Sequence, residues 1–455
     1  MRLAALLPLL AAGHALAETT EKETATNTLL TLTGSIATTT INDATVPTGD
    51  YLTYSSTIYL TTHGTALGST VVSGNDTSTG NATTAQNATM TTTSESVTVL
   101  VGGQTTLSGN GTANVTSTAP PASTSTAVNT QPCNGYPEFC NRKYSNITMV
   151  AAHNSPFVMK GNAAANQELD VTYQLEDGIR MLQLQAHLVN GTVYLCHTTC
   201  DLLNAGTLEA YLTTVAGWMR QHPYDVVTIL IGNYDYVNPG NFTAPIENSG
   251  LMDLVWTPPM IPMGLEDWPT LGNMIISGKR VLVFMDYQAN QTAIPWLMDE
   301  FSQMWETPFS PTDRNFPCTE QRPPNLSEKD AKERMYMANH NLNLQIDIAN
   351  INLLIPNTAL LNETNADTGY GSLGWMADNC TTMWNRPPNF LLVDYYNEGN
   401  FNGSVFQVAA DMNNVTYNRD SCCGTTSAGS SVLPGQSLMG TIFLFAAVPF
   451  LAHML

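Results

Sequence analysis

Four histidines lie at or near the ends of short apolar segments, where imidazole rings could exchange protons with a substrate. They are His153, His187, His197 and His340. Imidazole titrates near neutral pH, so one ring can remove a proton while a second ring delivers one. A lone histidine is more often structural than catalytic. His153 and His197 together carry more weight, because each ends an apolar segment and a parallel sheet would bring both rings to the same edge.

Amide and carboxylate side chains occupy similar places along the chain. Near segment ends stand Gln183, Gln185, Asn233, Asp235, Asp286 and Asp394. The three aspartates could hold a metal ion between them, or they could cap helices and bind loop amides. Asp394 could instead orient a histidine. Lys160 follows the first segment closely enough to reach the same region.

Short apolar segments alternate with amphipathic stretches between residues 132 and 417. The segments are 147–154, 179–187, 193–197, 226–235, 280–287, 334–340 and 390–397, and the helical stretches include 207–222 and 294–305. This alternation predicts a parallel sheet covered on both faces. About 285 residues suit an α/β fold of the (β/α)8 TIM-barrel type, possibly distorted, whose polar strand ends meet at one mouth. An open doubly wound sheet is the alternative, but no glycine-rich nucleotide motif follows any segment.

The composition indicates an exported protein. The chain has 16 Lys plus Arg against 37 Asp plus Glu, a formal charge of −21, which makes nucleic acid and anionic membrane surfaces poor partners. Charged residues supply only 12% of the chain. Thr, Ser and Asn take their place, and they form many Asn-x-Ser/Thr glycan acceptor sequences, which are used only along the secretory route.

The two ends of the chain carry targeting signals. Residues 1–17 have the features of a signal peptide, and residues 18–131 predict a glycosylated Ser/Thr-rich stalk of low complexity. Residues 418–455 contain small residues, a polar spacer and an apolar tail, the order of a glycosylphosphatidylinositol (GPI) anchor signal. A transmembrane helix is the alternative, but no Lys or Arg follows the tail. We expect a secreted protein held at the cell surface, on the plasma membrane or in the cell wall.

Eight cysteines in an oxidising compartment predict disulfides, since their spacing does not fit a zinc site. Local bridges from Cys133 to Cys140 and from Cys196 to Cys200 are plausible, and these would leave Cys318 to pair with Cys380. Sequence alone does not fix the connectivity.

Three motifs resemble the X region of phosphatidylinositol-specific phospholipase C, and above all the secreted fungal PLC-like phosphodiesterases of that superfamily. They are AAHNSPF at 151–157, DGIRMLQLQAH at 177–187 and VYLCH at 193–197. The resemblance implies a barrel in which two histidines cleave a phosphodiester by attack of the substrate's own inositol hydroxyl. His153 would be the base and His197 the acid. Asn154 takes the position that is Asn or Asp in the family, where it binds calcium or orients the base.

The chain departs from this family at the residues that supply positive charge. Animal relatives bind calcium with acidic residues on the strand after Gly-x-Arg, and bacterial relatives place an arginine there. This chain has Gln183 and Gln185, which are weak ligands for a hard cation. We therefore expect no metal and no cofactor. Arg180 should face the opposite side of its strand and tie the barrel to its helices, which leaves Lys160 as a candidate cation.

The leading hypothesis is an extracellular GPI-anchored phosphoric diester hydrolase that works without calcium, as a monomer, on a phospholipid or related phosphodiester. A catalytically silent barrel that serves as a wall or surface mannoprotein is the main alternative. A glycoside hydrolase would need paired carboxylates, usually including a Glu, and we expect no Glu at the strand ends. Sphingomyelinase D-like and glycerophosphodiesterase activities normally require a metal ion on carboxylates, so Gln183 and Gln185 argue against these activities as well.

Overall fold

The computed structural model describes residues 51–60, 130–348, 351–418 and 422–424. The predicted signal peptide, most of the predicted stalk and most of the predicted linker and anchor signal at 418–455 lie outside these ranges. Among the described residues, no helix has both the length and the apolar character that crossing a membrane requires.

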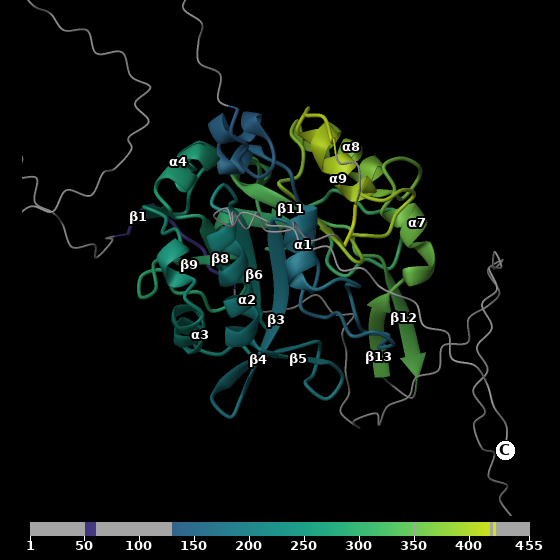
Figure 1. The fold of residues 1–455 in the computed structure, drawn as a ribbon, viewed down its shortest axis with the longest axis horizontal. Helices are drawn as coiled ribbons and strands as arrows, with labels where there is room; N and C mark the ends of the chain where they lie inside the picture. Colours follow the sequence, from purple (N-terminus) through teal and green to yellow (C-terminus); the bar gives the residue numbers. More distant parts are fainter. Residues whose placement is uncertain (1–50, 61–129, 349–350, 419–421, 425–455) are drawn as a thin grey trace, which may run out of the picture.

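Eight parallel strands form a curled sheet that surrounds the interior of the protein (Figure 1). Hydrogen-bonded neighbours follow the chain order from the first strand to the fifth, and again from the sixth through the eighth and back to the first. The strands are β2 (Met149–Ala152), β3 (Met181–Val189), β6 (Val227–Asn233), β8 (Val281–Met285), β9 (Leu297–Asp299), β10 (Met304–Glu306), β11 (Met335–Asn339) and β14 (Phe390–Val393). Within the described chain no ladder joins β9 to β10. The predicted distorted TIM-type barrel is therefore confirmed, with an open seam between these two strands.

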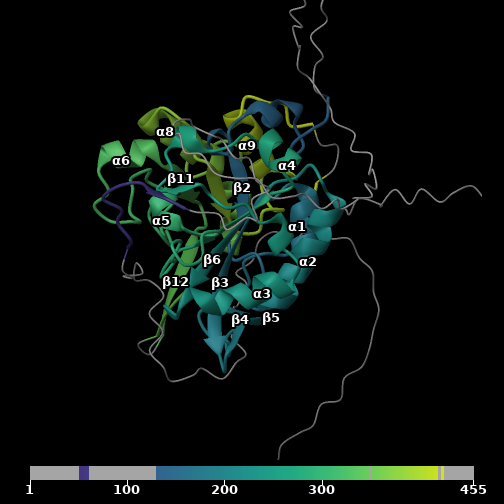
Figure 2. The ribbon, with the colours of Figure 1, turned by 90° about the vertical axis from the view of Figure 1, so that its left-hand side faces the viewer.

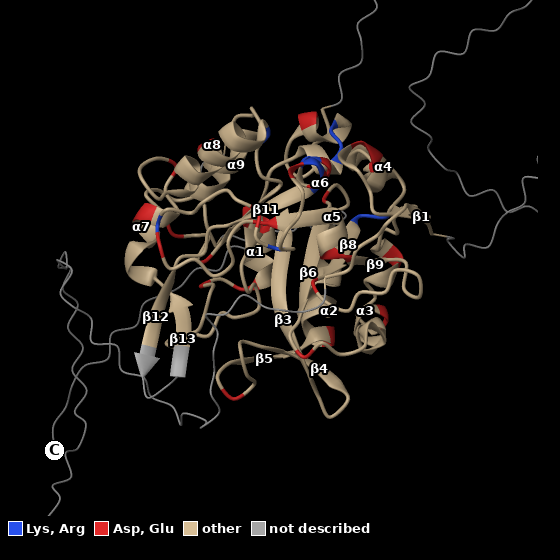
Figure 3. Cartoon of the chain, turned by 180° about the vertical axis from the view of Figure 1, so that it is seen from behind, with Lys and Arg blue, Asp and Glu red and all other residues tan. Residues whose placement is uncertain are grey.

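One end of the barrel carries two antiparallel extensions. β4 (Thr192–Cys196) folds back on β3 and pairs with β5 (Asn204–Thr207), while β12 (Asn343–Ile348) pairs with β13 (Ile351–Pro356). Both lie at the lower end in Figures 1 and 2. Figure 3 shows acidic segments around β4 and β5 and no basic segment there. This end is the mouth, because the barrel strands point their carboxyl ends toward it.

The interpretation of residues 193–197 as a parallel barrel strand is wrong. Val189 pairs with Thr192, so the connection is a two-residue turn of Asn190 and Gly191, which have φ of 51° and 79°. Positive φ at both positions is typical of the hairpin turn that Asn-Gly favours. The antiparallel return nevertheless carries His197 back to the mouth.

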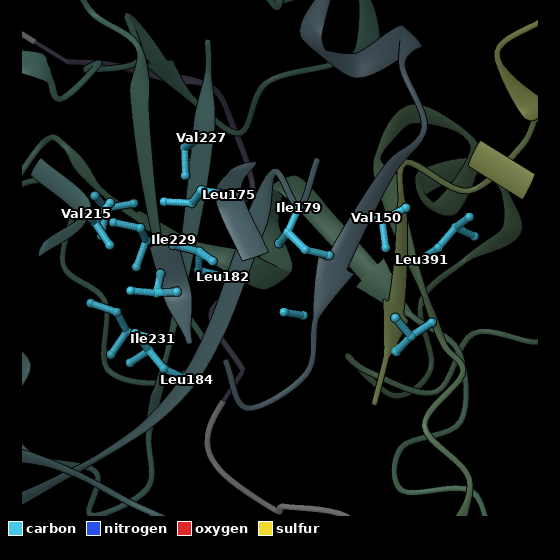
Figure 4. Close-up of a cluster of buried hydrophobic side chains, with 14 of the residues drawn as sticks. Val150, Leu175, Ile179, Leu182, Leu184, Val215, Val227, Ile229, Ile231 and Leu391 are labelled. Carbon is cyan, nitrogen blue, oxygen red and sulfur yellow. The ribbon is translucent and has the colours of Figure 1, made fainter. Parts of the chain in front are cut away.

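Side chains alternate between the two faces of each strand, so the buried core consists of one cluster inside the barrel and one between the sheet and the helices. In β14, Phe390 and Leu392 belong to a methionine-rich cluster inside the barrel, whereas Leu391 packs in the cluster between sheet and helices. Figure 4 shows Leu182 and Ile229 in this outer cluster. The alternation puts every second residue of a strand inside, so the inward residues nearest the carboxyl ends line the mouth.

Most helices cover the outer face of the sheet, whereas the helix at Leu271–Ile276 contributes Leu271 and Met274 to the methionine-rich cluster. These helices are α1 (Val171–Asp177), α2 (Leu208–Gln221), α3 (Thr243–Asn248), α4 (Leu271–Ile276), α6 (Glu328–Glu333), α7 (Leu361–Thr364), α8 (Leu373–Trp384) and α9 (Ser404–Met412). α2 confirms the helix predicted for residues 207–222, and the Thr207 hydroxyl caps it by accepting from the Ala210 N–H. Side-chain capping of this kind fixes the first turn of a helix.

The long helix predicted for residues 294–305 is wrong. These residues form β9, the four-residue α5 (Glu300–Gln303) and the start of β10. Every residue from Trp296 to Thr307 is buried. Burial on all sides removes the polar face that distinguishes a surface helix, and the apolar spacing alone therefore misled the prediction.

Residues 51–60 pack on the barrel, although they lie within the region predicted as stalk. β1 (Ile58–Tyr59) pairs antiparallel with β7 (Met260–Ile261). The Tyr51 ring lies 5.6 Å from the Tyr287 ring and 4.8 Å from the Phe301 ring. This short segment therefore contacts the side of the barrel near its seam.

The disulfides join Cys133 to Cys140, Cys196 to Cys200 and Cys318 to Cys380, which confirms the expected pairs. The two remaining cysteines, Cys422 and Cys423, are bonded to each other.

Candidate active site

His153 follows β2 on the inward face of the barrel and is held by two strands. Its Nδ1 lies 2.7 Å from Oδ1 of Asp394, the residue that follows β14. The Asn166 amide donates to the same carboxylate oxygen at 2.9 Å, and the Gln167 amide donates to the backbone oxygen of His153. A carboxylate on Nδ1 fixes the ring and leaves Nε2 to exchange a proton. The suggestion that Asp394 orients a histidine agrees with this contact.

His197 lies just beyond β4, in the small loop that the Cys196 disulfide closes. The Thr198 hydroxyl lies 3.2 Å from its Nδ1, and the side chain is buried. Burial lowers the pKa of His197 to about 3, with further repulsion from His153 and His187. Such repulsion acts over short distances in a protein. The fold thus brings the predicted pair together at the mouth, with His187 beside it.

Gln183 and Gln185 point inward from β3 and hold the backbone beside the two histidines. The Gln183 side-chain oxygen accepts from the Asn154 N–H at 2.7 Å, and the Gln185 oxygen accepts from the Thr198 N–H at 3.4 Å. Both side-chain oxygens are therefore engaged by the backbone, and Oδ1 of Asp394 is engaged by His153, whereas Oδ2 of Asp394 has no hydrogen-bond partner among the described residues. Gln183 and Gln185 are neutral amides and hence weak ligands for a hard cation, and we derive no step through a metal.

Asn154 contacts the proposed base directly. Its side-chain nitrogen lies 3.2 Å from Nε2 of His153, and its side-chain oxygen is buried with no hydrogen-bond partner among the described residues. Its backbone has φ of 49°, a left-handed conformation that Asn tolerates better than most residues. Asn154 is therefore placed to orient the base or to contact a substrate.

The aspartates predicted as a possible metal set bind different partners. Asp394 contacts His153, Asp235 contacts His187 at 2.9 Å, and Asp286 accepts from the backbone N–H groups of Asn233 and Tyr287. In the part of the chain that the structure describes, only Asp177, Cys422 and Cys423 cluster closely enough to suggest a metal, and those cysteines form a disulfide. The three aspartates do not form a metal site.

Lys160 and Arg180, the two basic residues considered in the sequence analysis, differ in their contacts. Lys160 is exposed in the loop after β2, and no hydrogen bond or ion pair among the described residues links it to the histidines. Arg180 pairs with Asp225 at 2.8 Å and lies over the Trp218 ring of α2. The prediction that Arg180 ties the barrel to its helices is confirmed.

Several polar residues at the mouth were missed. Asn166 and Gln167 lie in a loop without a periodic pattern, so nothing in the sequence singled them out. The expectation that no Glu lies at the strand ends is wrong, because Glu306 ends β10 and Glu300 follows β9. Glu300 lies within the incorrectly predicted helix, and Glu306 directly follows it. They lie side by side, and burial and repulsion from Glu306 raise the pKa of Glu300 well above its usual value. Glu306 is paired with Arg322 at 2.9 Å, so the two glutamates do not form the pair of free carboxylates that a glycoside hydrolase uses.

His340 is structural. Its Nε2 lies 2.8 Å from the Thr364 carbonyl oxygen and its Nδ1 lies 3.1 Å from the Met376 sulfur. Burial lowers the pKa of His340 to about 3. A lowered folded-state pKa gives stability that is present above pH 6.5 and lost as the pH falls toward 3.

We therefore expect the free energy of unfolding to decline less steeply between pH 6.5 and 3.5 in His340→Gln than in the wild-type protein. The variant also loses packing, so its stability at pH 7 is lower. Denaturant unfolding at several pH values measures both effects. Equal slopes in the two proteins would contradict the assignment of this titration to His340.

Comparisons with known proteins identify a family for this chain. A family model described as PI-PLC X 1 matches residues 139–413. An "Uncharacterized secreted protein" of Arthroderma benhamiae is 66% identical over 315 residues, covering 69% of this chain and 70% of the relative. A "PI-PLC X domain-containing protein 1" of the same organism is 42% identical over 269 residues, or 59% of this chain and 86% of the relative.

A solved phosphatidylinositol-specific phospholipase C from Staphylococcus aureus aligns with 61% of this chain and 94% of its own, at 12% identity and a TM-score of 0.36. The family match covers more than half of the chain and contains both predicted histidines and Asp394. The chain therefore belongs to the PI-PLC X domain family.

Proposed function

We propose that the chain is an extracellular phosphoric diester hydrolase that cleaves an inositol phospholipid or related phosphodiester without calcium. It would act as a monomer held to the membrane by a GPI lipid. The observation that carries the proposal is the His153 ring, anchored by Asp394 at 2.7 Å and close to a second ring, His197. Paired imidazoles at one mouth are suited to transfer protons to and from a phosphodiester.

His153 acts as the base. With Nδ1 held by Asp394, its Nε2 removes the proton of the inositol hydroxyl next to the phosphate. The hydroxyl oxygen forms a bond to phosphorus as the bond from phosphorus to the glycerol oxygen breaks. The products are a cyclic inositol phosphate and a diacylglycerol.

His197 gives the leaving glycerol oxygen its proton. In the free protein this ring is neutral, because its pKa is lowered to about 3. A phosphate anion beside the ring favours the protonated form, since opposite charges stabilise each other. Substrate binding therefore favours protonation of His197, which can then act as the acid. Asn154, Gln183 and Gln185 orient the two rings, and Lys160 is a candidate contact for the lipid headgroup.

Phosphorus NMR of the full glycosylated chain with phosphatidylinositol tests the proposal. The expected product signal is that of a cyclic phosphodiester, formed between pH 5 and 8 equally with calcium and with a chelator. No product under any of these conditions would favour the silent surface mannoprotein. The neutral Gln183 and Gln185 and the lowered pKa of His197 are the observations that favour this second candidate.

A further inference from the structure

Lys and Arg are scarce in the loops that surround the mouth. None occurs in residues 181–219, 221–278, 286–313, 340–385 or 394–418. These stretches contain the loops after β3, β6, β8, β9, β11 and β14. A phosphodiester in transfer carries negative charge, and stabilising that charge is usually the largest part of catalysis. Its cation must therefore come from elsewhere.

The basic residues in the remaining mouth loops are engaged or exposed. Arg322 is buried and contacts Glu306 at 2.9 Å, while Arg314 contacts Glu363 at 2.7 Å. Lys160 is exposed. Arg322 is neutralised by its carboxylate, so it offers little net charge to a second anion. The remaining side chains at the mouth that can become cationic are histidines.

His187 lies on β3 two residues beyond Gln185, on the same inward face. Its Nδ1 lies 2.9 Å from Oδ1 of Asp235, and the second oxygen of Asp235 accepts from the Leu188 N–H at 2.8 Å. The ring is about nine-tenths buried, and its Nε2 has no hydrogen-bond partner among the described residues. The carboxylate on Nδ1 repeats the contact of His153 with Asp394, whereas the unpartnered Nε2 distinguishes His187 from His153, whose Nε2 lies 3.2 Å from the Asn154 amide.

His187 also lies close to His197, the proposed acid. It is near enough to His197 for the two charged rings to repel each other. The ring centroids of His187 and Tyr234 are 4.9 Å apart. The charged or titratable groups around His187 are therefore Asp235, Tyr234 and His197. Asp235 is the only group among them that stabilises a cation on His187.

We propose that His187, oriented by Asp235, binds a phosphoryl oxygen through Nε2–H and supplies the positive charge that Gln183 and Gln185 cannot provide. This assignment rests on the proposed phosphodiester hydrolase function. His187 would contact the substrate and is therefore a catalytic residue, whereas Asp235 acts through it as a positioning residue. No bond to His187 forms or breaks, and its proton stays on Nε2.

Steady-state kinetics of the full glycosylated chain on phosphatidylinositol test this role. His187→Gln keeps a hydrogen-bond donor but loses the charge, and we expect kcat/KM to fall about 100-fold. His187→Arg carries a permanent charge and should recover most of the rate. It should also extend activity to higher pH, because an arginine does not lose its proton there. Asp235→Asn should give a smaller loss than His187→Gln and lower the pH at which activity declines.

His222→Gln is the matched control. His222 also contacts a carboxylate, Glu176 at 3.2 Å, but it lies at the end of α2 away from the mouth. This variant should keep the wild-type rate. Full activity in His187→Gln would overturn the proposal. So would a loss in Lys160→Gln without a loss in His187→Gln, because it would assign the charge to Lys160.

A binding experiment separates this proposal from the proposed function. Calorimetry with myo-inositol 1-phosphate needs no turnover, and we expect His187→Gln to bind this anion at least 10-fold more weakly than His222→Gln does. A wild-type protein that binds the anion through His187 but cleaves no lipid would reject the hydrolase and support the anion site. Turnover that is unaffected by His187→Gln would reject the anion site alone. If the wild-type protein neither binds the anion nor cleaves the lipid, both the hydrolase function and the anion site are rejected.

Discussion

His153→Ala is expected to lower kcat/KM on phosphatidylinositol by about 10³- to 10⁴-fold, the upper range for a general base. The variant removes the ring whose Nδ1 lies 2.7 Å from Asp394 and leaves the carboxylate without its main partner. No other described imidazole contacts Asp394, so none is placed to substitute. The measurement is the rate of cyclic phosphate formation at substrate concentrations well below KM.

Asp394→Asn supplies a graded comparison. The amide can still contact Nδ1, but it does not stabilise the positive charge that His153 gains when it takes a proton. We expect a loss of about 100-fold or more and a shift of the pH profile, with unchanged thermal stability. His222→Ala removes another carboxylate-bound imidazole away from the mouth and serves as the control. A His153→Ala protein that is folded and retains more than a tenth of the wild-type rate would contradict the assignment of the base.

The six barrel strands that the sequence predicted share one property. Each is a continuous apolar segment with a polar residue at its carboxyl end, as in β2 with His153 and β14 with Asp394. Complete burial produces the apolar run, and the barrel mouth produces the polar end. The missed strands, β9 and β10, are three residues each and are joined by four buried residues. The joining residues include Glu300, Ser302 and Gln303 but no Gly, Pro, Asn or Asp, so no typical turn residue marks the boundary.

In the candidate site, too, some residues have a sequence signal and others do not. His153 and His197 were found because each ends an apolar segment, and the motif resemblance identified them as a pair. The partners of the rings were harder to find. Asn166 comes from a loop and contacts Asp394 across 228 positions of sequence, and such a contact depends on the tertiary fold alone. The role of His187 was equally hidden, because its partner Asp235 comes from the next strand of the sheet.

A buried cluster of charged residues lies beside the ends of β8 and β10, and this cluster leads to the second large prediction. Arg322 is 4% exposed and contacts Glu306 at 2.9 Å and Asp286 at 3.7 Å. Its guanidinium lies over the Phe301 ring. Glu306 also accepts from the Asn339 amide at 3.1 Å. Glu306 is therefore the main counter-charge of a cation that water does not reach.

Glu306→Gln should lower the free energy of unfolding by about 3 to 5 kcal/mol, the usual cost of removing one partner of a buried ion pair. Glu300→Gln should change it by less than about 1 kcal/mol at pH 5. Glu300 is adjacent to Glu306, and its raised pKa keeps it neutral, so an amide of similar shape replaces a neutral acid. The two variants make the same chemical change at neighbouring positions and differ only in the charge that they remove.

The pH dependence distinguishes the two glutamates further. A folded-state pKa raised above the unfolded value gives stability that is present at low pH and lost as the pH rises through the folded pKa. Removing Glu300 removes this loss, so Glu300→Gln should become more stable relative to wild type as the pH rises, while Glu306→Gln stays less stable throughout. Denaturant unfolding of the full chain from pH 5 to 8 measures both. Equal destabilisation by the two substitutions would mean that Glu300 is charged in the folded protein and shares the neutralisation of Arg322 with Glu306.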